Sequence, residues 1–178
     1  KKAKDASFLL GKMGSGEKNK GLLAAAEEML KGQDEILKAN ANDVKKAKEK
    51  GMAQGLVDRL LLTPDRILGI VRQVAGLEDP VGEVISMKKR PNGLVVGQKR
   101  VPMGVIGMIY EARPNVTADA FGLCFKSGNA VILKGGSDAI HSNMAITSVI
   151  REALLKEGIT ADAILLIEST DRSVVQEF

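Results

Sequence analysis

The sequence contains no tryptophan and only one residue each of tyrosine, cysteine and histidine, namely Tyr110, Cys124 and His141. A single cysteine excludes an internal disulfide framework and agrees with a reducing compartment, so we expect a cytoplasmic location. A single histidine excludes a two-histidine metal site within the chain, and we expect no bound metal. Because aromatic residues make up only 3% of the sequence, the core must consist mainly of Leu, Ile, Val, Ala and Met.

Long hydrophobic runs are also missing. No stretch reaches the roughly 18 uninterrupted apolar residues that a membrane-spanning helix needs, and residues 1–5 lack the apolar core of a secretory signal. The net charge is +4, but the lysines at 45–50 share their segment with Asp43 and Glu49, and no aromatic residues are interleaved to stack on bases. Solvated helix faces explain these lysines, so we expect neither a nucleic-acid nor a membrane partner.

Residues 1–80 are predicted to be helical. Apolar side chains recur at steps of three and four over residues 22–44, which keeps one apolar face through several turns. Gly32 interrupts this pattern and costs roughly 1 kcal/mol relative to Ala, so we expect two nearly coaxial helices. A later helix is predicted to begin at residues 63–65, where Thr63 can cap, Pro64 suits the first turn and Asp65 meets the positive helix end.

Residues 81–101 are predicted to form a β-hairpin. Apolar residues at 84–87 and 94–96 flank the turn Pro91-Asn92-Gly93, in which Asn-Gly supplies the positive φ angles of a tight turn. Basic residues surround both strands. A charged hairpin that projects from a helical layer is often an interface element, so we expect it to mediate oligomerisation.

Residues 102–178 alternate between short apolar runs and helical patterns. The apolar runs are 105–109, 130–133 and 163–167. Helices are predicted over 115–126, up to Gly158, and from Thr170 onward. Continuous apolar strands separated by helices indicate a parallel sheet buried on both faces, with right-handed connections. The predicted fold class is therefore α/β: a helical layer, a projecting hairpin and a Rossmann-like β-α-β-α-β array that looks unfinished with three strands.

Common catalytic signatures are absent. Gly14-Ser15-Gly16 fails as a dinucleotide fingerprint because Asn19 stands where the third glycine belongs. There is no P-loop, and His141 has no nucleophile elbow to complete a Ser/His/Asp triad. Ligands of open α/β folds bind at the carboxyl ends of the strands, and two predicted strand ends, 110–117 and 133–138, are rich in polar and glycine residues.

Two segments closely resemble the γ-glutamyl phosphate reductase family, a branch of the aldehyde dehydrogenase superfamily. They are RVPMGVIGMIYEARPNVT at 100–117 and KSGNAVILKGG at 126–136. Shorter stretches that are in register with this family complete the resemblance: 40–43, 58–60, 62–64 and 79–82. The resemblance covers essentially the whole chain.

The resemblance implies NADPH-dependent reduction of L-glutamyl 5-phosphate to L-glutamate 5-semialdehyde, with release of phosphate, in proline biosynthesis. In the superfamily a cysteine thiolate attacks the acyl carbon, and hydride from the nicotinamide reduces the resulting thioester. The resemblance also implies that this chain is the N-terminal, cofactor-binding part, that the catalytic cysteine lies beyond Phe178, and that the chain alone is inactive. A dimer or tetramer is expected for the full-length protein. The alternative is a non-catalytic nucleotide-binding or assembly module of the same fold.

The resemblance also suggests a cofactor site after the second strand. Lys134 matches a lysine that reaches the adenosine ribose and can pair with a 2′-phosphate. Three positions later, where relatives that prefer NAD often carry an acid, this chain has Ser137, which favours NADP(H). Gly135 and Gly136 would let the backbone approach the ligand closely, although a solvated strand-to-helix turn also explains this segment.

The loop after the first strand provides the other candidates. Asn115 matches an asparagine that helps form the oxyanion hole, worth roughly 3 kcal/mol or more, but a helix N-cap explains it equally well. Arg113, with Glu111 beside it, could bind the acyl phosphate or the substrate carboxylate by paired hydrogen bonds. A salt bridge between Arg113 and Glu111 or another acid is the alternative. Cys124 lies in an apolar helical segment, so we expect a buried, inert thiol there and not the nucleophile.

Overall fold

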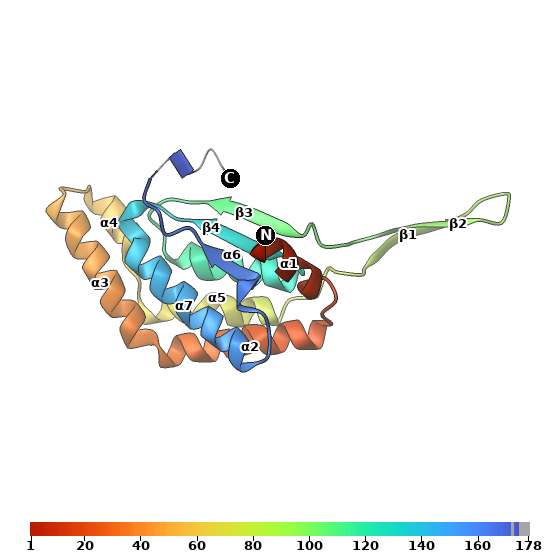
Figure 1. Ribbon diagram of the computed structural model, residues 1–178, viewed down its shortest axis with the longest axis horizontal. Helices are drawn as coiled ribbons and strands as arrows, with labels where there is room; N and C mark the ends of the chain where they lie inside the picture. The colour runs from red at the N-terminus through yellow and green to blue at the C-terminus, as the bar shows by residue number, and fades with distance from the viewer. Residues whose placement is uncertain (172, 175–178) are drawn as a thin grey trace.

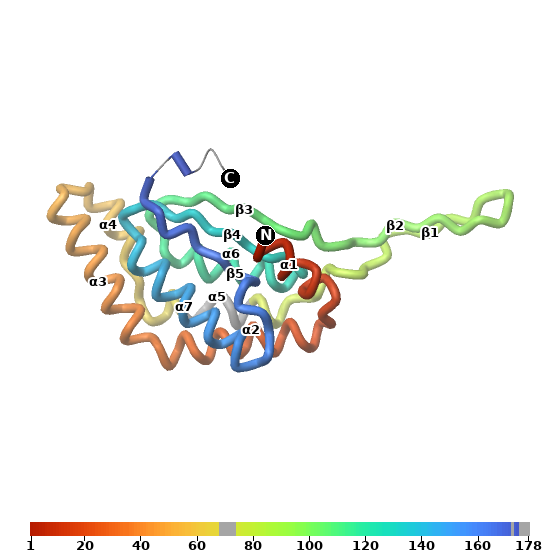
Figure 2. Tube along the Cα trace, viewed as in Figure 1, coloured from red at the N-terminus to blue at the C-terminus, as the bar shows by residue number. Residues whose placement is uncertain are grey.

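The computed structural model describes the backbone of residues 1–171 and 173–174, and the side chains of these residues except for 68–73. Figures 1 and 2 show a helical layer, a long hairpin that projects away from it, and a small sheet. The helix expected from Thr170 onward lies mostly outside the described residues. The fold class is α/β, as the sequence predicts.

Five helices precede the hairpin: α1 (Lys2–Leu10), α2 (Ser15–Lys31), α3 (Gln33–Glu49), α4 (Gln54–Leu60) and α5 (Pro64–Ala75). Gly32 separates α2 from α3, as predicted, but the expectation of nearly coaxial helices is wrong. Figure 1 shows the two helices at a clear angle. Both pack against the same later helix, α7 (Ile140–Lys156). A Cβ on Gly32 would lie 3.2 Å from Val149 Cγ2 of that helix, so the bend falls where α7 comes closest.

Helix α5 begins where the sequence predicts. The helix begins at Pro64, and the backbone N–H of Arg66 donates to Thr63 Oγ1 over 3.4 Å. The Arg66 guanidinium then donates to the carbonyls of Asp58 and Leu61, which ties the end of α4 to the start of α5.

The hairpin consists of β1 (Val84–Lys89) and β2 (Val95–Lys99), paired antiparallel. Its turn differs from the one predicted. Only Gly93 has a positive φ, at 88°, and Asn92 does not. The Gly93 N–H donates to the Arg90 carbonyl, and Asn92 Oδ1 accepts from the Leu94 N–H. This pattern is a three-residue loop in which Gly93 alone needs left-handed geometry.

The sheet contains β3 (Val105–Ile109), β4 (Ala130–Lys134) and β5 (Ile164–Leu166), all parallel, in the order β3-β4-β5. The first crossover is helix α6 (Asn115–Lys126), whose bounds match the prediction. The second comprises the short turn η1 (Ser137–Ala139), α7 and η2 (Ala161–Ala163). The Rossmann-like β-α-β-α-β pattern is thus confirmed.

The prediction that the sheet is buried on both faces is wrong for its first strand. Ile106, Met108 and Tyr110 pack against the core, but Val105 is 38% and Ile109 55% exposed. Two crossovers that advance in the same direction place their helices on one face only. The crossover helices α6 and α7 therefore do not cover the outward side of β3.

A buried ion pair joins α2 to the segment that leads into the hairpin. Lys18, which is 1% exposed, pairs with Asp79, which is 8% exposed. Asp79 also accepts hydrogen bonds from Ser15 Oγ and from the Val81 N–H. Burial raises the pKa of Asp79, but these hydrogen bonds outweigh that effect, and the pKa lies below its ordinary value. The motif at 79–82 thereby has a structural role.

We expect Asp79→Asn to lower the free energy of unfolding by about 3–5 kcal/mol, because it leaves the buried Lys18 ammonium without a carboxylate. The folded-state pKa of Asp79 is depressed, so its contribution is present above the unfolded-state pKa and is lost as the pH falls through the folded value. Urea unfolding at neutral and acidic pH measures both effects. The control is Glu27→Gln, an exposed acid on α2. Equal stabilities of the two variants at neutral pH would contradict the assignment.

Candidate functional site

The carboxyl ends of the three parallel strands lie at one edge of the sheet, and the two segments singled out in the sequence meet there. The Tyr110 N–H donates to the Lys134 carbonyl, and the Ile167 N–H donates to the Leu133 carbonyl. The loops that follow β3, β4 and β5 therefore begin side by side, at the position where open α/β folds bind ligands.

Lys134, the predicted ribose-binding residue, ends β4 and is only 6% exposed. Within the described residues its ammonium makes one hydrogen bond, to the Gly135 carbonyl over 3.2 Å. An ammonium has three donors, so two of them have no partner among these residues. A buried cation with unused donors is a suitable group for holding a polar ligand.

Gly135 is needed for packing inside the chain, whereas a Cβ on Gly136 would fit at ordinary contact distance. A Cβ on Gly135 would lie 2.2 Å from Asn143 Nδ2, and one on Gly136 would lie 3.4 Å from the backbone of Glu111. Gly135 thus lets the loop after β4 approach helix α7 closely, and Gly136 lies against the loop after β3. A larger residue at position 135 would push the loop after β4 away from α7.

Asn115 is the first residue of α6, and the structure shows no side-chain cap at this helix end. The N-cap interpretation is therefore wrong. Asn115 Nδ2 instead donates to Asp119 Oδ2 over 3.1 Å, one turn further along the helix. Burial raises the pKa of Asp119, and the Asn115 hydrogen bond lowers it by a smaller amount. Because the amide nitrogen carries two hydrogens, a second N–H is left for another acceptor.

Arg113 and Glu111 are both exposed, in the loop between β3 and α6. The Arg113 N–H donates to the Glu111 carbonyl over 2.9 Å. In the part of the chain that the structure describes, their side chains form no ion pair with each other or with another charged group. The salt-bridge alternative thus has no support among these residues.

A chain of buried polar groups, which the sequence analysis missed, ties the site together. Tyr110 Oη lies 2.6 Å from Thr117 Oγ1, and the Thr117 hydroxyl donates to Asn143 Oδ1 over 3.0 Å. Burial raises the pKa of Tyr110 to about 12, with a smaller opposing effect from Thr117. Three residues thereby connect β3, α6 and α7. The only sign of this chain in the sequence is that its three polar residues lie within apolar patterns.

The start of α7 is held by a residue of α3. Asp43 is 2% exposed and accepts from the backbone N–H groups of His141 and Ser142, from Ser142 Oγ and from His141 Nδ1. Asn40, one turn earlier, bonds to the Leu60 carbonyl and to Ser142 Oγ. Together the buried Asn40, Asp43 and Ser142 and the partly exposed His141 fix the start of α7 against α3.

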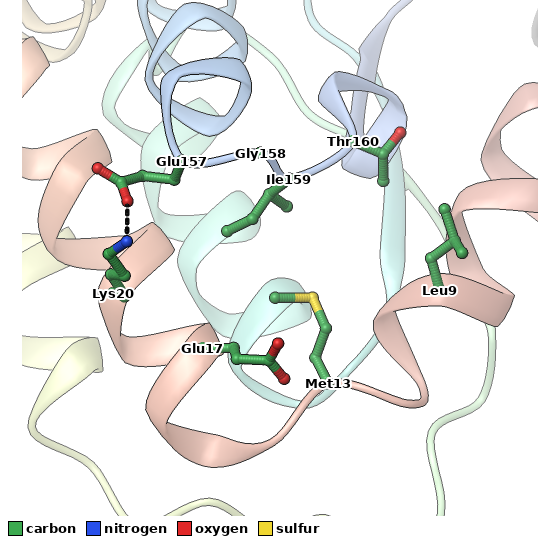
Figure 3. A pocket seen from close by; sticks show the side chains of 8 residues that line it. All are labelled: Leu9, Met13, Glu17, Lys20, Glu157, Gly158, Ile159 and Thr160. Atoms are coloured by element: carbon green, nitrogen blue, oxygen red, sulfur yellow. Dashed lines mark ion pairs between the residues drawn. The ribbon is translucent and has the colours of Figure 1, made fainter.

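A pocket of about 250 Å³ opens beside these residues, at the same edge of the sheet. It is lined by Asp43, Lys46, Ala47, Lys50, Ser137, Asp138, His141 and Thr170. A second pocket, of about 320 Å³, lies among α1, α2 and the end of α7. Figure 3 shows Leu9, Met13 and Ile159 in it, with the Lys20–Glu157 ion pair at its rim. That pocket lies away from the candidate residues.

Neither a membrane-crossing helix nor a metal-binding group is found in the described part of the chain. None of its helices is sufficiently long and apolar to cross a bilayer. Among the same residues, no three His, Cys, Asp or Glu side chains come together in a way that could hold a metal ion.

Cys124 lies on the buried face of α6 and is 4% exposed, as the sequence predicts. Burial raises the pKa of its thiol to about 11. The thiolate is the reactive form, so almost none of this cysteine is nucleophilic near neutral pH.

We expect the Cys124 thiol to react with a disulfide reagent such as Ellman's reagent far more slowly in the folded chain than in urea, by about a hundredfold or more. Both the raised pKa and the lack of access slow the reaction. The release of thionitrobenzoate in buffer and in denaturant gives the ratio. Equal rates would show that the thiol is exposed.

Comparison with known proteins agrees with this geometry. The sequence profile of the aldehyde dehydrogenase family matches residues 1–178. The chain is 56% identical to the γ-glutamyl phosphate reductase of Lachnospira eligens over 179 residues, which cover 99% of this chain and 43% of that protein. It therefore spans less than half the length of the curated relatives that it matches.

Two crystal structures of γ-glutamyl phosphate reductases are also similar. That of Thermotoga maritima has 47% sequence identity and a TM-score of 0.95, covering 99% of this chain and 43% of its own. That of Saccharomyces cerevisiae has 31% identity and a TM-score of 0.88, covering 96% and 45% respectively. Because the family profile matches all of residues 1–178, the chain belongs to the aldehyde dehydrogenase family.

Proposed function

We propose that the protein containing this chain reduces L-glutamyl 5-phosphate to L-glutamate 5-semialdehyde with NADPH, releasing phosphate, as a step of proline biosynthesis. The chain contributes the cofactor side of that enzyme. The observation that carries the proposal is that Lys134 and the loop leading to Asn115 follow neighbouring strand ends at one sheet edge, in a chain 56% identical to a protein named γ-glutamyl phosphate reductase.

The residues after β4 fit the adenosine half of NADPH. Lys134 offers two ammonium donors to the ribose, and its burial strengthens any hydrogen bond to a charged or polar ligand. Ser137 is exposed and carries no charge, so it would not repel a 2′-phosphate. Gly135 and Gly136 let the loops pack closely enough to place these two residues. When bound, the cofactor would supply hydride to the acyl carbon.

The loop after β3 fits the reacting end of the substrate. Asp119 holds one N–H of Asn115, and the second N–H is left to donate to an acyl oxygen as negative charge develops on it. Arg113 is exposed, and its guanidinium has no carboxylate partner among the described residues. It can therefore bind the acyl phosphate or the α-carboxylate of the substrate, with Glu111 beside it.

The hairpin supports a homo-oligomer. Its apolar residues face solvent, for example Ile85 at 55%, Met87 at 67% and Leu94 at 59% exposure. An extended two-stranded ribbon is marginally stable alone, so we propose that it packs against a second copy of the full-length protein. The single cysteine supports a reducing compartment, and we propose the cytoplasm.

We expect Lys134→Met to weaken NADPH binding by about tenfold or more, because a charge-assisted hydrogen bond is lost while the apolar stem is kept. Titration of the chain with NADPH and with NADH, followed by cofactor fluorescence, gives both affinities. NADH should bind more weakly to the unmodified chain. Lys88→Met, in the hairpin, is the charge-matched control. Unchanged NADPH affinity in Lys134→Met, with a normal melting temperature, would contradict the role of Lys134.

We also expect no turnover by the 178-residue chain alone. Its only cysteine is Cys124, which is buried and has a pKa raised to about 11, so the chain has no thiolate to attack the acyl carbon. The reverse reaction, with glutamate semialdehyde, phosphate and NADP⁺, is followed by NADPH absorbance. Turnover above the background of a Cys124→Ser variant would overturn this expectation.

A further inference from the structure

Asp119 lies on α6, one turn after Asn115, and its two carboxylate oxygens have different surroundings. Oδ2 accepts a hydrogen bond from Asn115 Nδ2 over 3.1 Å. Oδ1 is buried and has no hydrogen-bond partner among the residues whose side chains the structure describes. A buried polar atom that makes no hydrogen bond costs free energy. These surroundings are therefore unfavourable for the carboxylate of Asp119.

The contribution of Asp119 to stability does not account for an acid at this position. Its neighbours in the sequence, Ala118 and Ala120, are both buried. Burial raises the pKa of Asp119 more than the Asn115 hydrogen bond lowers it, so the surroundings disfavour the charged form. A contact between side chains four residues apart on a helix stabilises the helix only slightly. The contact of Asp119 with a candidate site residue therefore points to a role in the site.

The carboxylate of Asp119 determines which end of the Asn115 amide faces it. The amide has an oxygen that accepts and a nitrogen that carries two donors, and the two ends are nearly equal in size. Because an ionised carboxylate only accepts, the nitrogen must face Asp119. One N–H is then bound, and the other points away from Asp119. Among the described residues Asn115 Nδ2 has no second acceptor, so this N–H is left for a ligand.

The backbone that carries Asn115 is fixed independently of Asp119. The side chain of Thr117, two residues later, lies 2.6 Å from Tyr110 Oη and donates to Asn143 Oδ1. These contacts hold the first turn of α6 against β3 and α7. The side-chain torsions of Asn115 are the freedom that remains, and the contact with Asp119 restricts them. A donor that is already oriented needs no reorganisation when negative charge develops on its acceptor.

We propose that Asp119 is a positioning residue that holds the Asn115 amide ready to donate to the acyl oxygen of the substrate. The assignment rests on the proposed function, in which Asn115 stabilises the negative charge that develops on that oxygen. Asp119 does not contact the substrate and acts through Asn115 alone. Its partly buried place on α6 is then a cost in stability that serves the orientation of one donor.

The test compares variants of the full-length protein that contains this chain, using the steady-state kinetics of glutamate semialdehyde, phosphate and NADP⁺. Asp119→Leu keeps a side chain of similar size and removes the acceptor. We expect it to lower kcat and kcat/KM equally, by about tenfold or more, because it weakens an interaction made only in the transition state. Its melting temperature should not fall, since leucine removes a buried oxygen that lacks a partner. Asp34→Leu, at an exposed position of α3, is the matched control.

A double-variant cycle shows whether Asp119 acts through Asn115. In an Asn115→Ala background the amide is gone, so Asp119→Leu should change kcat by less than about twofold. Asp119→Asn keeps the shape of the carboxyl group, but its own amide can present either an oxygen or a nitrogen to Asn115. Its kcat should therefore lie between those of the unmodified protein and Asp119→Leu.

The other outcomes separate this assignment from the proposed function. Equal losses on Asp119→Leu in both backgrounds overturn it, because the effect then does not pass through Asn115. A lower melting temperature with a raised KM shows a structural role instead. A kcat of Asp119→Asn above that of the unmodified protein shows that the carboxylate charge opposes the reaction, which also overturns it. If Asn115→Ala keeps full activity, this assignment fails while the proposed reaction stands. If the unmodified protein does not reduce NADP⁺, the proposed function fails, and this assignment fails with it.

Discussion

The buried carboxylate of Asp43 is the interaction on which the candidate site depends. It lies on α3 but accepts hydrogen bonds from two backbone N–H groups and two side chains at the start of α7. A buried carboxylate is stable only when such donors surround it, so α3 and α7 can meet in one arrangement only. The loop of residues 134–137 leads directly into the contact between α3 and α7. The position of this loop therefore follows from that contact.

The carboxyl edge of the sheet is organised by a second set of buried polar contacts. Tyr110, Thr117 and Asn143 form a chain of hydrogen bonds across β3, α6 and α7. Gly135 packs against Asn143, and Gly136 packs against the backbone of Glu111. The residues proposed to contact the cofactor and the substrate are thus held by groups that face the interior. A change at Gly135 would therefore alter the site through packing even without any direct contact with a ligand.

The sequence predicted the elements well and some of their details poorly. The bounds of α6 and the parallel order of three short strands follow from apolar periodicity, which burial imposes locally. The angle between α2 and α3 does not, because it depends on the contact of both helices with α7. Nor does the role of the Asn115 amide, which an oxyanion-hole donor and a helix cap explain equally well from the sequence. Asn40 and Asp43 lie in one of the stretches that resemble the family, but their contacts with the start of α7 were not predicted from the sequence.

By itself, the sequence determined the α/β class, the hairpin, the buried state of Cys124 and the family to which the chain belongs. Each of these follows from local pattern, because periodicity, turn residues and long motifs are carried by neighbouring positions. The tertiary structure decided which distant residues meet. Lys46 and His141 are far apart in the chain, and the packing of α3 against the start of α7, where Asp43 binds His141, brings their side chains to within 3.4 Å of each other. Hydrogen bonds of this kind leave no periodic trace in the sequence, since their partners are chosen by the packing of whole helices.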